Sequence, residues 1–307
     1  DAADIQGVAE YDSGASSYTI ADSADAVLIA SNESTILNDG VSGVVVTDAT
    51  GAGYVDASDG AALSFLEGQL QAATNDGAAD IEFRVEDDAA AIAAVLSGNN
   101  GGALDGANDL EVTGGTTTMV GAADIQSSGA YDAANSSYTI TDTAGAILGD
   151  TATAIDDGVS HIIVDGNVGA GVGVQLGALE DASFETGYSA DINFNVVDDA
   201  NDIASVLAVS GTSLDNAANM IVSGGTVSVD IASDIQGVTG YDASNSDYTI
   251  EDSSAAILQG AATVIDSGVE QVFVTDTVDV ADGVSLSDME VALEAERGLD
   301  AADIDFD

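Results

Sequence analysis

Residues Ser17-Tyr18-Thr19-Ile20-Ala21-Asp22 form a short stretch that returns throughout the chain. Near copies with the same pattern, some with Phe in place of Tyr, are Glu82–Asp87, Ser137–Asp142, Asn193–Asp198, Asp247–Asp252 and the partial copy Asp305–Asp307. The aromatic residue lies at positions 18, 83, 138, 194, 248 and 306. This spacing predicts a repeat unit of about 56 residues, paired into a longer unit of about 110 to 120 residues, because alternate copies resemble each other most.

The repeated stretch has the pattern of a strand followed by a helix. Tyr18 and Ile20 alternate with Thr19 and Ala21, which is typical of a half-buried strand. Asp22 is then expected to be the N-cap of a helix. An aliphatic residue follows each such Asp after five positions, at Val27, Ile92, Ile147, Ile203 and Ile257. This constant spacing predicts one helical register packed against one sheet.

A second strand and a second helical run complete each unit. Gly43–Asp48 is the first example of the second strand, and Ala62–Glu67 is the first example of the second helical run. Strands separated by helices favour parallel pairing with right-handed crossovers. We expect the aromatic strands to form one parallel sheet, with their rings in a ladder about 4.8 Å apart. The second strands are expected to form another sheet.

The predicted fold class is therefore α/β, a solenoid-like repeat array of strand-helix-strand-helix units with parallel sheet. The expected segments are residues 1–123, a first unit pair, residues 124–233, a second pair, and residues 234–307, a truncated third pair. Tandem small α/β domains joined by Gly-rich linkers are the alternative. They rank lower because Trp is absent and only 5% of residues are aromatic, so one unit has few large apolar residues to close a core.

The charge of the chain limits its partners. It contains 55 Asp and Glu residues against 2 Lys and Arg, a formal net charge of −53. Nucleic acid is excluded as a partner because phosphate binding requires basic residues, and anionic membrane surfaces are disfavoured for the same reason. No stretch is suited to membrane insertion, and the absence of cysteine excludes disulfides and thiolate metal sites.

Acidic loops rich in Gly and Asn suggest calcium as a cofactor, because carboxylate and amide oxygens are the ligands that Ca²⁺ prefers. The candidate metal ligands are Asp56, Asp59, Asp76, Asp80, Asp105, Asp156 and Asp157. None of these loops has the spacing of an EF-hand. The strand-end acids, Asp22, Asp87, Asp142, Asp198 and Asp252, are interpreted as helix caps, with cation binding as the alternative.

No residue stands out as catalytic. His161 is the single histidine and is expected at the surface, and Arg84 and Arg297 are expected to form solvent-exposed ion pairs. The copies show no carboxylate pair that is placed differently from the rest, as acid–base catalysis would require. The turn tyrosines, Tyr11, Tyr131 and Tyr241, are expected to be exposed and either to staple each turn onto the array or to hold glycans.

The motif that runs from Tyr138 to Leu148, and again from Tyr248 to Leu258, resembles repeats of very large, acidic, lysine-poor surface and adhesin-like proteins of cyanobacteria and other aquatic bacteria. The resemblance implies secretion, an extracellular location, a structural role and calcium binding. Asp1 opens without a basic, apolar leader, so we expect either that a signal was removed or that the sequence is part of a longer chain.

These observations predict a non-enzymatic extracellular structural protein, a calcium-stabilised array that forms or extends a cell-surface fibre, a surface layer or an adhesin stalk. The expected partner is the chain itself, through head-to-tail or lateral assembly into filaments. A surface module that binds glycans is the alternative. A solenoid polysaccharide lyase or hydrolase is a remote third hypothesis.

Overall fold

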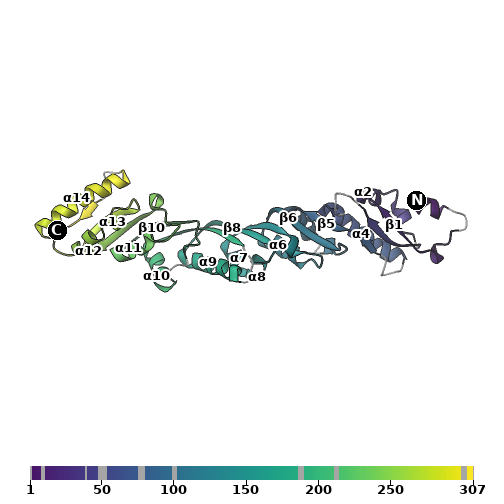
Figure 1. Cartoon of the computed structure of the whole chain (residues 1–307), viewed down its shortest axis with the longest axis horizontal. Helices are drawn as coiled ribbons and strands as arrows, with labels where there is room; N and C mark the ends of the chain where they lie inside the picture. Colours follow the sequence, from purple (N-terminus) through teal and green to yellow (C-terminus); the bar gives the residue numbers. More distant parts are fainter. Residues whose placement is uncertain are drawn as a thin grey trace. The chain divides into compact units, whose positions relative to one another are not determined.

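The computed structural model describes residues 2–7, 11–38, 40–47, 54–74, 80–98, 102–185, 190–210, 214–298 and 303–306. The chain divides into two compact units. Unit 1 comprises Asp1–Thr141 and Asp150–His161, and unit 2 comprises Asp142–Gly149 and Ile162–Asp307. Helices and strands alternate along each of them (Figure 1).

The strands up to the boundary between the units are β1 (Tyr18–Asp22), β2 (Val41–Val46), β3 (Tyr54–Val55), β4 (Asp80–Glu82), β5 (Arg84–Asp87), β6 (Asp109–Thr117), β7 (Ser137–Asp142) and β8 (Val159–Val168), which begins in unit 1 and continues in unit 2. The helices of unit 1 are α1 (Ala2–Gln6), α2 (Ala24–Val27), α3 (Glu33–Ile36), α4 (Ala57–Thr74), α5 (Ala89–Gly98), α6 (Met119–Ser127) and α8 (Thr151–Ala154). Short 3₁₀ helices are η1 (Ser13–Ala15), η2 (Gly102–Leu104) and η3 (Ala133–Asn135).

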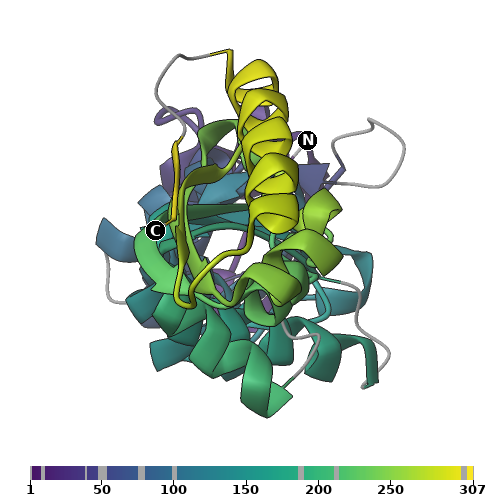
Figure 2. The ribbon, with the colours of Figure 1, turned by 90° about the vertical axis from the view of Figure 1, so that its left-hand side faces the viewer.

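The remaining strands of unit 2 are β9 (Asp191–Asp198), β10 (Asn219–Val227), β11 (Asp247–Asp252), β12 (Val269–Val274) and β13 (Asp303–Asp305). Its helices are α7 (Ala144–Gly149), α9 (Ala170–Glu185), α10 (Ala200–Ser210), α11 (Val229–Gln236), α12 (Ser254–Gln259), α13 (Ala261–Val264), α14 (Val280–Arg297) and the 3₁₀ helix η4 (Ala243–Asn245). Helix α14, the yellow helix in Figure 2, packs beside β13, the strand that follows it.

The sheets of both units are built from parallel strands, which confirms the predicted α/β class. In unit 2 the strands pair in chain order from β9 to β13. In unit 1 one sheet has the order β1-β2-β4, and a second set pairs in the order β3-β5-β6-β7. Parallel neighbours need a crossover connection, and the helices between successive strands provide it.

The expected separation of aromatic and second strands into two sheets is wrong. Tyr248 lies on β11, and β11 pairs with β10 on one side and β12 on the other, both of which are second strands. The aromatic rings therefore do not form a ladder of neighbours. One helix carries the chain only to the adjacent position in the sheet, so strands that are consecutive in sequence become neighbours in space.

The aromatic strand of unit 1 is interrupted where that of unit 2 is continuous. Residues Asp80–Asp87 form two strands, β4 and β5, separated at Phe83, and these pair in different sheets. The equivalent β9 runs without a break from Asp191 to Asp198. Phe83 and Phe194 are nevertheless both buried. The interruption therefore changes strand pairing and leaves the aromatic residue in the core.

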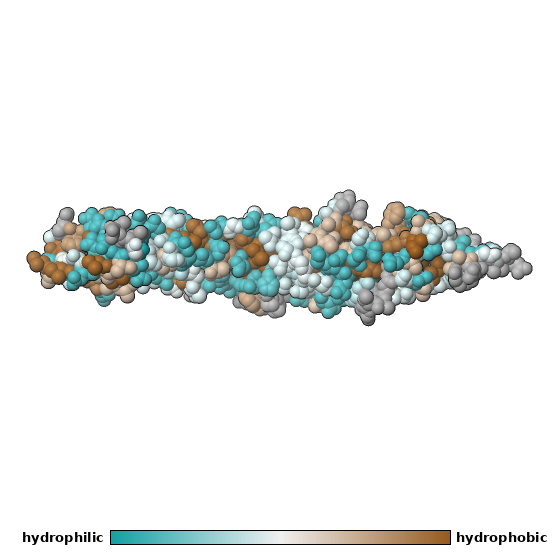
Figure 3. Space-filling view, turned by 90° about the horizontal axis from the view of Figure 1, so that it is seen from above, coloured by the Kyte–Doolittle hydropathy of each residue, from teal (hydrophilic) through white to brown (hydrophobic). Residues whose placement is uncertain are grey.

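The core is built from aliphatic residues, as composition predicts. The five aliphatic residues expected to share one helical register, Val27, Ile92, Ile147, Ile203 and Ile257, are all at most 2% exposed, which confirms that prediction. Other large apolar residues remain exposed on helices, including Phe65, Phe184 and Val209. Apolar residues are scattered among polar ones on the face shown in Figure 3.

The strand-end acids are not the N-caps of the helices that follow them. In every described copy the capping side chain belongs to the next residue, as when Ser23 Oγ accepts from Ala26 N at 3.2 Å and Asp199 Oδ1 accepts from Asp202 N at 3.1 Å. The strand-end acid itself accepts through Oδ1 from the backbone N–H of that next residue, as Asp198 does from Asp199. This corrects the predicted capping by one position.

The second oxygen of three strand-end acids points back to the helix before the strand. Asp87 Oδ2 accepts from Ala57 N at 3.0 Å, Asp198 Oδ2 from Ala170 N at 2.9 Å, and Asp252 Oδ2 from Val229 N at 3.2 Å. These donors are the first residues of α4, α9 and α11. A carboxylate at a helix N-terminus satisfies a free N–H and is favoured by the helix dipole. Each acid therefore joins the N-termini of two helices.

In β6 and β10 a glycine, and not an acid, lies close to the first residue of the preceding helix. Gly115 has φ +76° and Gly225 has φ +89°. A Cβ atom on Gly225 would lie 2.9 Å from the backbone N of Ala200, at the start of α10, and one on Gly115 would lie 3.1 Å from Ala89 N, at the start of α5. Glycine is therefore required both for the backbone angle and for the close approach.

The turn tyrosines are half-buried rather than exposed, which corrects one expectation and supports the staple. Tyr131 Oη donates to Asp156 Oδ1 at 2.6 Å, and Gln126 Nε2 donates to both Tyr138 Oη at 2.8 Å and Thr153 O at 3.0 Å. Tyr241 and Tyr11 make the equivalent bonds to Asp266 and Asn38, both at 2.6 Å. Each network ties the turn before an aromatic strand to the turn after it.

Candidate metal centre

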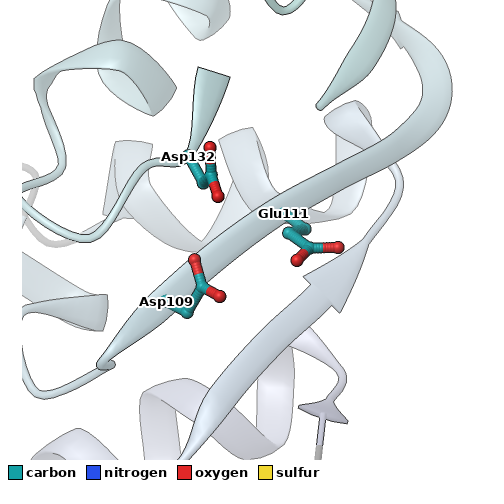
Figure 4. Close-up of side chains that lie close together, drawn as sticks. All are labelled: Asp109, Glu111 and Asp132. Carbon is teal, nitrogen blue, oxygen red and sulfur yellow. The ribbon is translucent and has the colours of Figure 1, made fainter. Parts of the chain in front are cut away.

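Three carboxylates in unit 1 come together on the outer face of β6. Asp109 and Glu111 are two residues apart on this strand, so they project on one face, while Leu110 and Val112 are buried on the other. Asp132 joins them because Tyr131 forms a parallel β-bridge with Leu110. Figure 4 shows the three side chains together, and their ligand oxygens all lie within 4.8 Å of one another.

Hydrogen bonds from neighbouring groups hold the three carboxylates. Asp132 caps η3, because its Oδ1 accepts from Ala134 N at 3.1 Å and its Oδ2 accepts from Asn135 Nδ2 at 2.8 Å. Tyr54 on β3 donates its hydroxyl group to Glu111. All three acids are half-buried. The acids are thus positioned by the strand, the short turn and a tyrosine.

A basic residue lies beside the cluster. The Arg84 guanidinium lies 5.8 Å from the centre of the Tyr54 ring, a cation–π contact. Arg84 is also paired in register with Asp109 on the neighbouring strand. Arg84 is exposed, as expected from sequence, and its charge also acts on Asp109.

The cluster has an excess of negative charge. Burial raises the pKa of Asp109, and the carboxylates of Glu111 and Asp132 raise it further, while Arg84 acts in the opposite direction. The hydrogen bond to Glu111, with burial, raises the pKa of Tyr54 to about 12, so Tyr54 remains a donor at neutral pH. A bound cation would relieve the repulsion between the three carboxylates.

A second cluster in unit 2 contains Asp198, Asp199 and Asp202. The hydrogen bonds of its first two acids are those of helix caps: Asp198 bridges Ala170 N and Asp199 N, and Asp199 Oδ1 also accepts from Asn201 N at 2.8 Å. Asp202 is fully exposed, and the charges of Asp199 and Asp198 raise its pKa. Both clusters could hold a metal ion, but helix capping already accounts for most of this second one.

The seven predicted ligands lie outside both clusters or outside the described residues. Asp56 caps α4, accepting from Asp59 N at 2.8 Å, and Asp59 lies in the first turn of that helix. Asp156 accepts from Tyr131 Oη and from Gly158 N, and the neighbouring Asp157 is exposed in the same turn.

Asp80 begins β4 and hydrogen-bonds with Glu67, and Asp105 is exposed in the turn after η2. Asp76 lies outside the described residues. The structure brings none of the six described candidates into a group of three acids.

The sequence contained a signal for the cluster that the loop-based search missed. Asp109 and Glu111 alternate with Leu110 and Val112, so the strand pattern places both acids on one outer face. Asp132 could not be added from sequence, because it reaches the strand only through the bridge made by Tyr131. This cluster lies on a strand and not in one of the Gly-rich loops where the sequence predicts metal ligands.

The other residues named from the sequence, His161 and Arg297, lie outside both acidic clusters. His161 is exposed on β8, and its Nδ1 lies 3.2 Å from Ser160 Oγ. Arg297 is largely buried rather than solvent-exposed, with 13% of its side-chain surface accessible, and its Nη2 lies 3.8 Å from Asp247 Oδ1. Within the described ranges, no helix has the length and apolarity that crossing a membrane would require.

Comparison with known proteins gave no match: no family model, no curated protein and no solved structure proved similar to this chain. The candidate site is therefore defined by its geometry. Three clustered carboxylates supply hard oxygen ligands, which suit a cation such as Ca²⁺, Mg²⁺ or Mn²⁺.

Proposed function

We propose that this chain is part of a non-enzymatic extracellular structural protein, a repeat array that forms or extends a cell-surface fibre, surface layer or adhesin stalk. The observation that supports this most is the repetition of the same links between elements. Asp87, Asp198 and Asp252 each join a strand to the N-terminus of the preceding helix. Repeated nearest-neighbour links of this kind suit an array that gains length by adding units.

The solenoid-like arrangement of the units belongs to the same proposal. Consecutive strands pair in parallel throughout unit 2, and the acid and tyrosine links recur at corresponding positions in both units. Self-association, head-to-tail or lateral, is the partner interaction that such an array would use to form filaments. The strong excess of acidic residues is suited to a hydrated surface layer.

Deletion of one whole unit pair tests the array. The segments Asp124-Ile125-Gln126 and Asp234-Ile235-Gln236 are identical. Joining Ala123 directly to Asp234 therefore leaves the sequence around the junction unchanged. A chain that lacks residues 124–233 should therefore fold, with a shorter particle in negative-stain images. A control that lacks residues 152–233, which is not a whole number of units, should lose cooperative thermal unfolding. If the first deletion unfolds like the control, the array is refuted.

Calcium is proposed as the stabilising cation, at Asp109, Glu111 and Asp132. Ca²⁺ takes 6–8 oxygen ligands, so the three carboxylates would be completed by water. Thermal unfolding with 5 mM CaCl₂ and with EGTA tests this point, and imaging in the same two buffers tests assembly into filaments. An equal unfolding temperature in both buffers would refute calcium stabilisation.

A further inference from the structure

A glutamate occurs at the same place in three long helices. It is the eleventh residue of each helix, and it faces the acid that begins the next strand. The three pairs are Glu67 with Asp80, Glu180 with Asp191, and Glu290 with Asp303. Like charges that face each other in three copies are unusual for groups that are meant to stay ionised, because repulsion and burial both oppose the charged form.

Glu180 on α9 is the most buried of the three, with 8% of its surface accessible. Its Oε1 accepts a long hydrogen bond from Ile192 N at 3.4 Å, and its Oε2 is buried with no hydrogen-bond partner. The nearby Asn216 amide donates to Gly177 O at 3.4 Å and to Asp181 Oδ1 at 3.3 Å instead. One oxygen of a buried carboxyl group is therefore left without a donor.

The charged groups that act on Glu180 are all acidic. They are Asp191 on β9 and Asp181 on α9 itself. Of the helices packed against α9, α7 has no charged residue, and α10 has only Asp202, which lies with Asp198 and Asp199. Nothing in these elements supplies a positive charge to Glu180.

Glu290 on α14 has the same kind of surroundings. It hydrogen-bonds with Asp303 and accepts from Ile304 N, and Glu294 is the other nearby acid. Helix α12, which packs against α14, contains no charged residue. Arg297 on α14 is directed to Asp247 instead.

We propose that Glu180 and Glu290 are proton-binding sites that make the folded chain more stable in mildly acidic solution. A neutral carboxyl group can donate its proton to the facing Asp carboxylate, which replaces repulsion between two charges by a charge-assisted hydrogen bond. The chain has only 2 Lys and Arg residues, so solvent protons are the available source of positive charge.

The direction of the titration agrees with the geometry. Burial is the main cause that raises the pKa of Glu180 and of Glu290. A group whose pKa is higher in the folded than in the unfolded chain stabilises folding fully below its unfolded pKa. That stabilisation is lost as the pH rises through the folded pKa. The two sites should therefore weaken the fold as the pH rises above the ordinary glutamate pKa of about 4.3 and the protons leave.

Carbon-detected NMR of the unmodified chain tests the sites directly. The Cδ resonances of Glu180 and Glu290 are followed from pH 3.5 to pH 8.5 in EGTA, which excludes bound metal. We expect midpoints above the ordinary glutamate value of about 4.3. Midpoints at or below that value would overturn the proposal.

A matched pair of variants tests the effect on stability. Gln has the shape of the neutral acid, so E180Q/E290Q should raise the unfolding temperature at pH 8 and narrow the difference between pH 5 and pH 8. The control E251Q/E270Q removes the same number of charges from exposed positions in unit 2. It corrects for the general relief of repulsion in an acidic chain. If both variants narrow the difference equally, the buried sites are refuted, and if E180Q/E290Q fails to fold, the NMR midpoints decide.

Discussion

The outer face of β5 and β6 in unit 1 and that of β9 and β10 in unit 2 have the same strand pairing and different side-chain chemistry. Each second strand carries a Gly-Gly pair with positive φ and is bridged by a turn tyrosine, at Leu110–Tyr131 and Met220–Tyr241. Unit 1 places Arg84, Asp109 and Glu111 on this face. Unit 2 places Asn195, Asn219 and Ile221 at the equivalent positions.

The comparison shows which of the three acids the fold itself requires. The third acid is kept in both units, as Asp132 and Asp242, because it caps a 3₁₀ helix in each. In unit 2, hydrogen bonds from Asn245 and Ser244 lower the pKa of Asp242. Asp109 and Glu111 are replaced by Asn219 and Ile221 in unit 2, so the shared fold does not require them. Their grouping in unit 1 is therefore a candidate for binding, and unit 2 is a built-in control.

The largest expected effect comes from breaking the backbone that the two faces share. Gly225→Val should destabilise the chain by about 2–4 kcal/mol, because it adds strain at positive φ and a clash with Ala200 N. Gly115→Val should have a similar effect in unit 1. Urea unfolding measures both. The neighbouring exposed substitution Ser223→Val is the control, and an equal loss there would show that the glycine geometry is unimportant.

Converting the face of unit 1 into that of unit 2 should abolish the response to calcium. D109N/E111I introduces the residues that the fold already accepts at Asn219 and Ile221, so folding should survive. With free calcium 100-fold above its Kd, the wild-type chain should gain about 2.7 kcal/mol, and the variant should gain none. Isothermal titration calorimetry and thermal unfolding measure the change. An unchanged calcium response in the folded variant would locate the cation elsewhere.

The reverse exchange should sharpen the comparison. N219D/I221E beside Asp242 rebuilds the three carboxylates in unit 2, where Tyr54 and Arg84 are replaced by Asn167 and Asn195. We expect destabilisation without calcium by about 1–2 kcal/mol from the added like charges, and partial recovery with calcium. Unfolding curves in EGTA and in CaCl₂ decide the outcome. Equal loss in both buffers would mean that the three acids alone are not sufficient.

The smallest expected effect concerns the support of the cluster. Tyr54→Phe removes the hydroxyl donor to Glu111 and keeps the ring under Arg84, so it should cost about 0.5–1.5 kcal/mol. The calcium response should persist, since no carboxylate is lost. Tyr131→Phe, which removes the bond to Asp156, is a comparison at a structural network. Loss of calcium binding in Tyr54→Phe would make the hydroxyl group part of the site.

The sequence predicted the elements of the fold better than their assembly. The spacing of Ile92, Ile203 and Ile257 correctly predicted one helical face, and alternation correctly predicted the strands. The spacing of the repeats could not show whether aromatic strands pair with one another or alternate with second strands, because both arrangements have the same repeat length. Crossover geometry decides that point, and it places Tyr248 between two second strands.

The candidate site was predictable only in part. Asp109 and Glu111 share one face of a strand by their spacing alone, but their relation to Asp132 depends on a turn that packs back against β6. The strand-end acids were correctly linked to helix N-termini, but the cap of the following helix is one residue further on, and the bond to the preceding helix was not predicted. Sequence proximity favours the following helix, whereas the parallel sheet brings the start of the preceding helix to the same edge.

The hydrogen bond between a strand-end acid and the preceding helix has consequences for folding during synthesis and for the choice of fragments. The first N–H of α11 finds its acceptor on Asp252, which leaves the ribosome 23 residues after Val229. A helix in this chain is thus completed only after the next strand has been synthesised and has docked. Fragments for expression should end after such an acid rather than after a helix, and a nascent chain should gain order in steps that lag one strand behind synthesis.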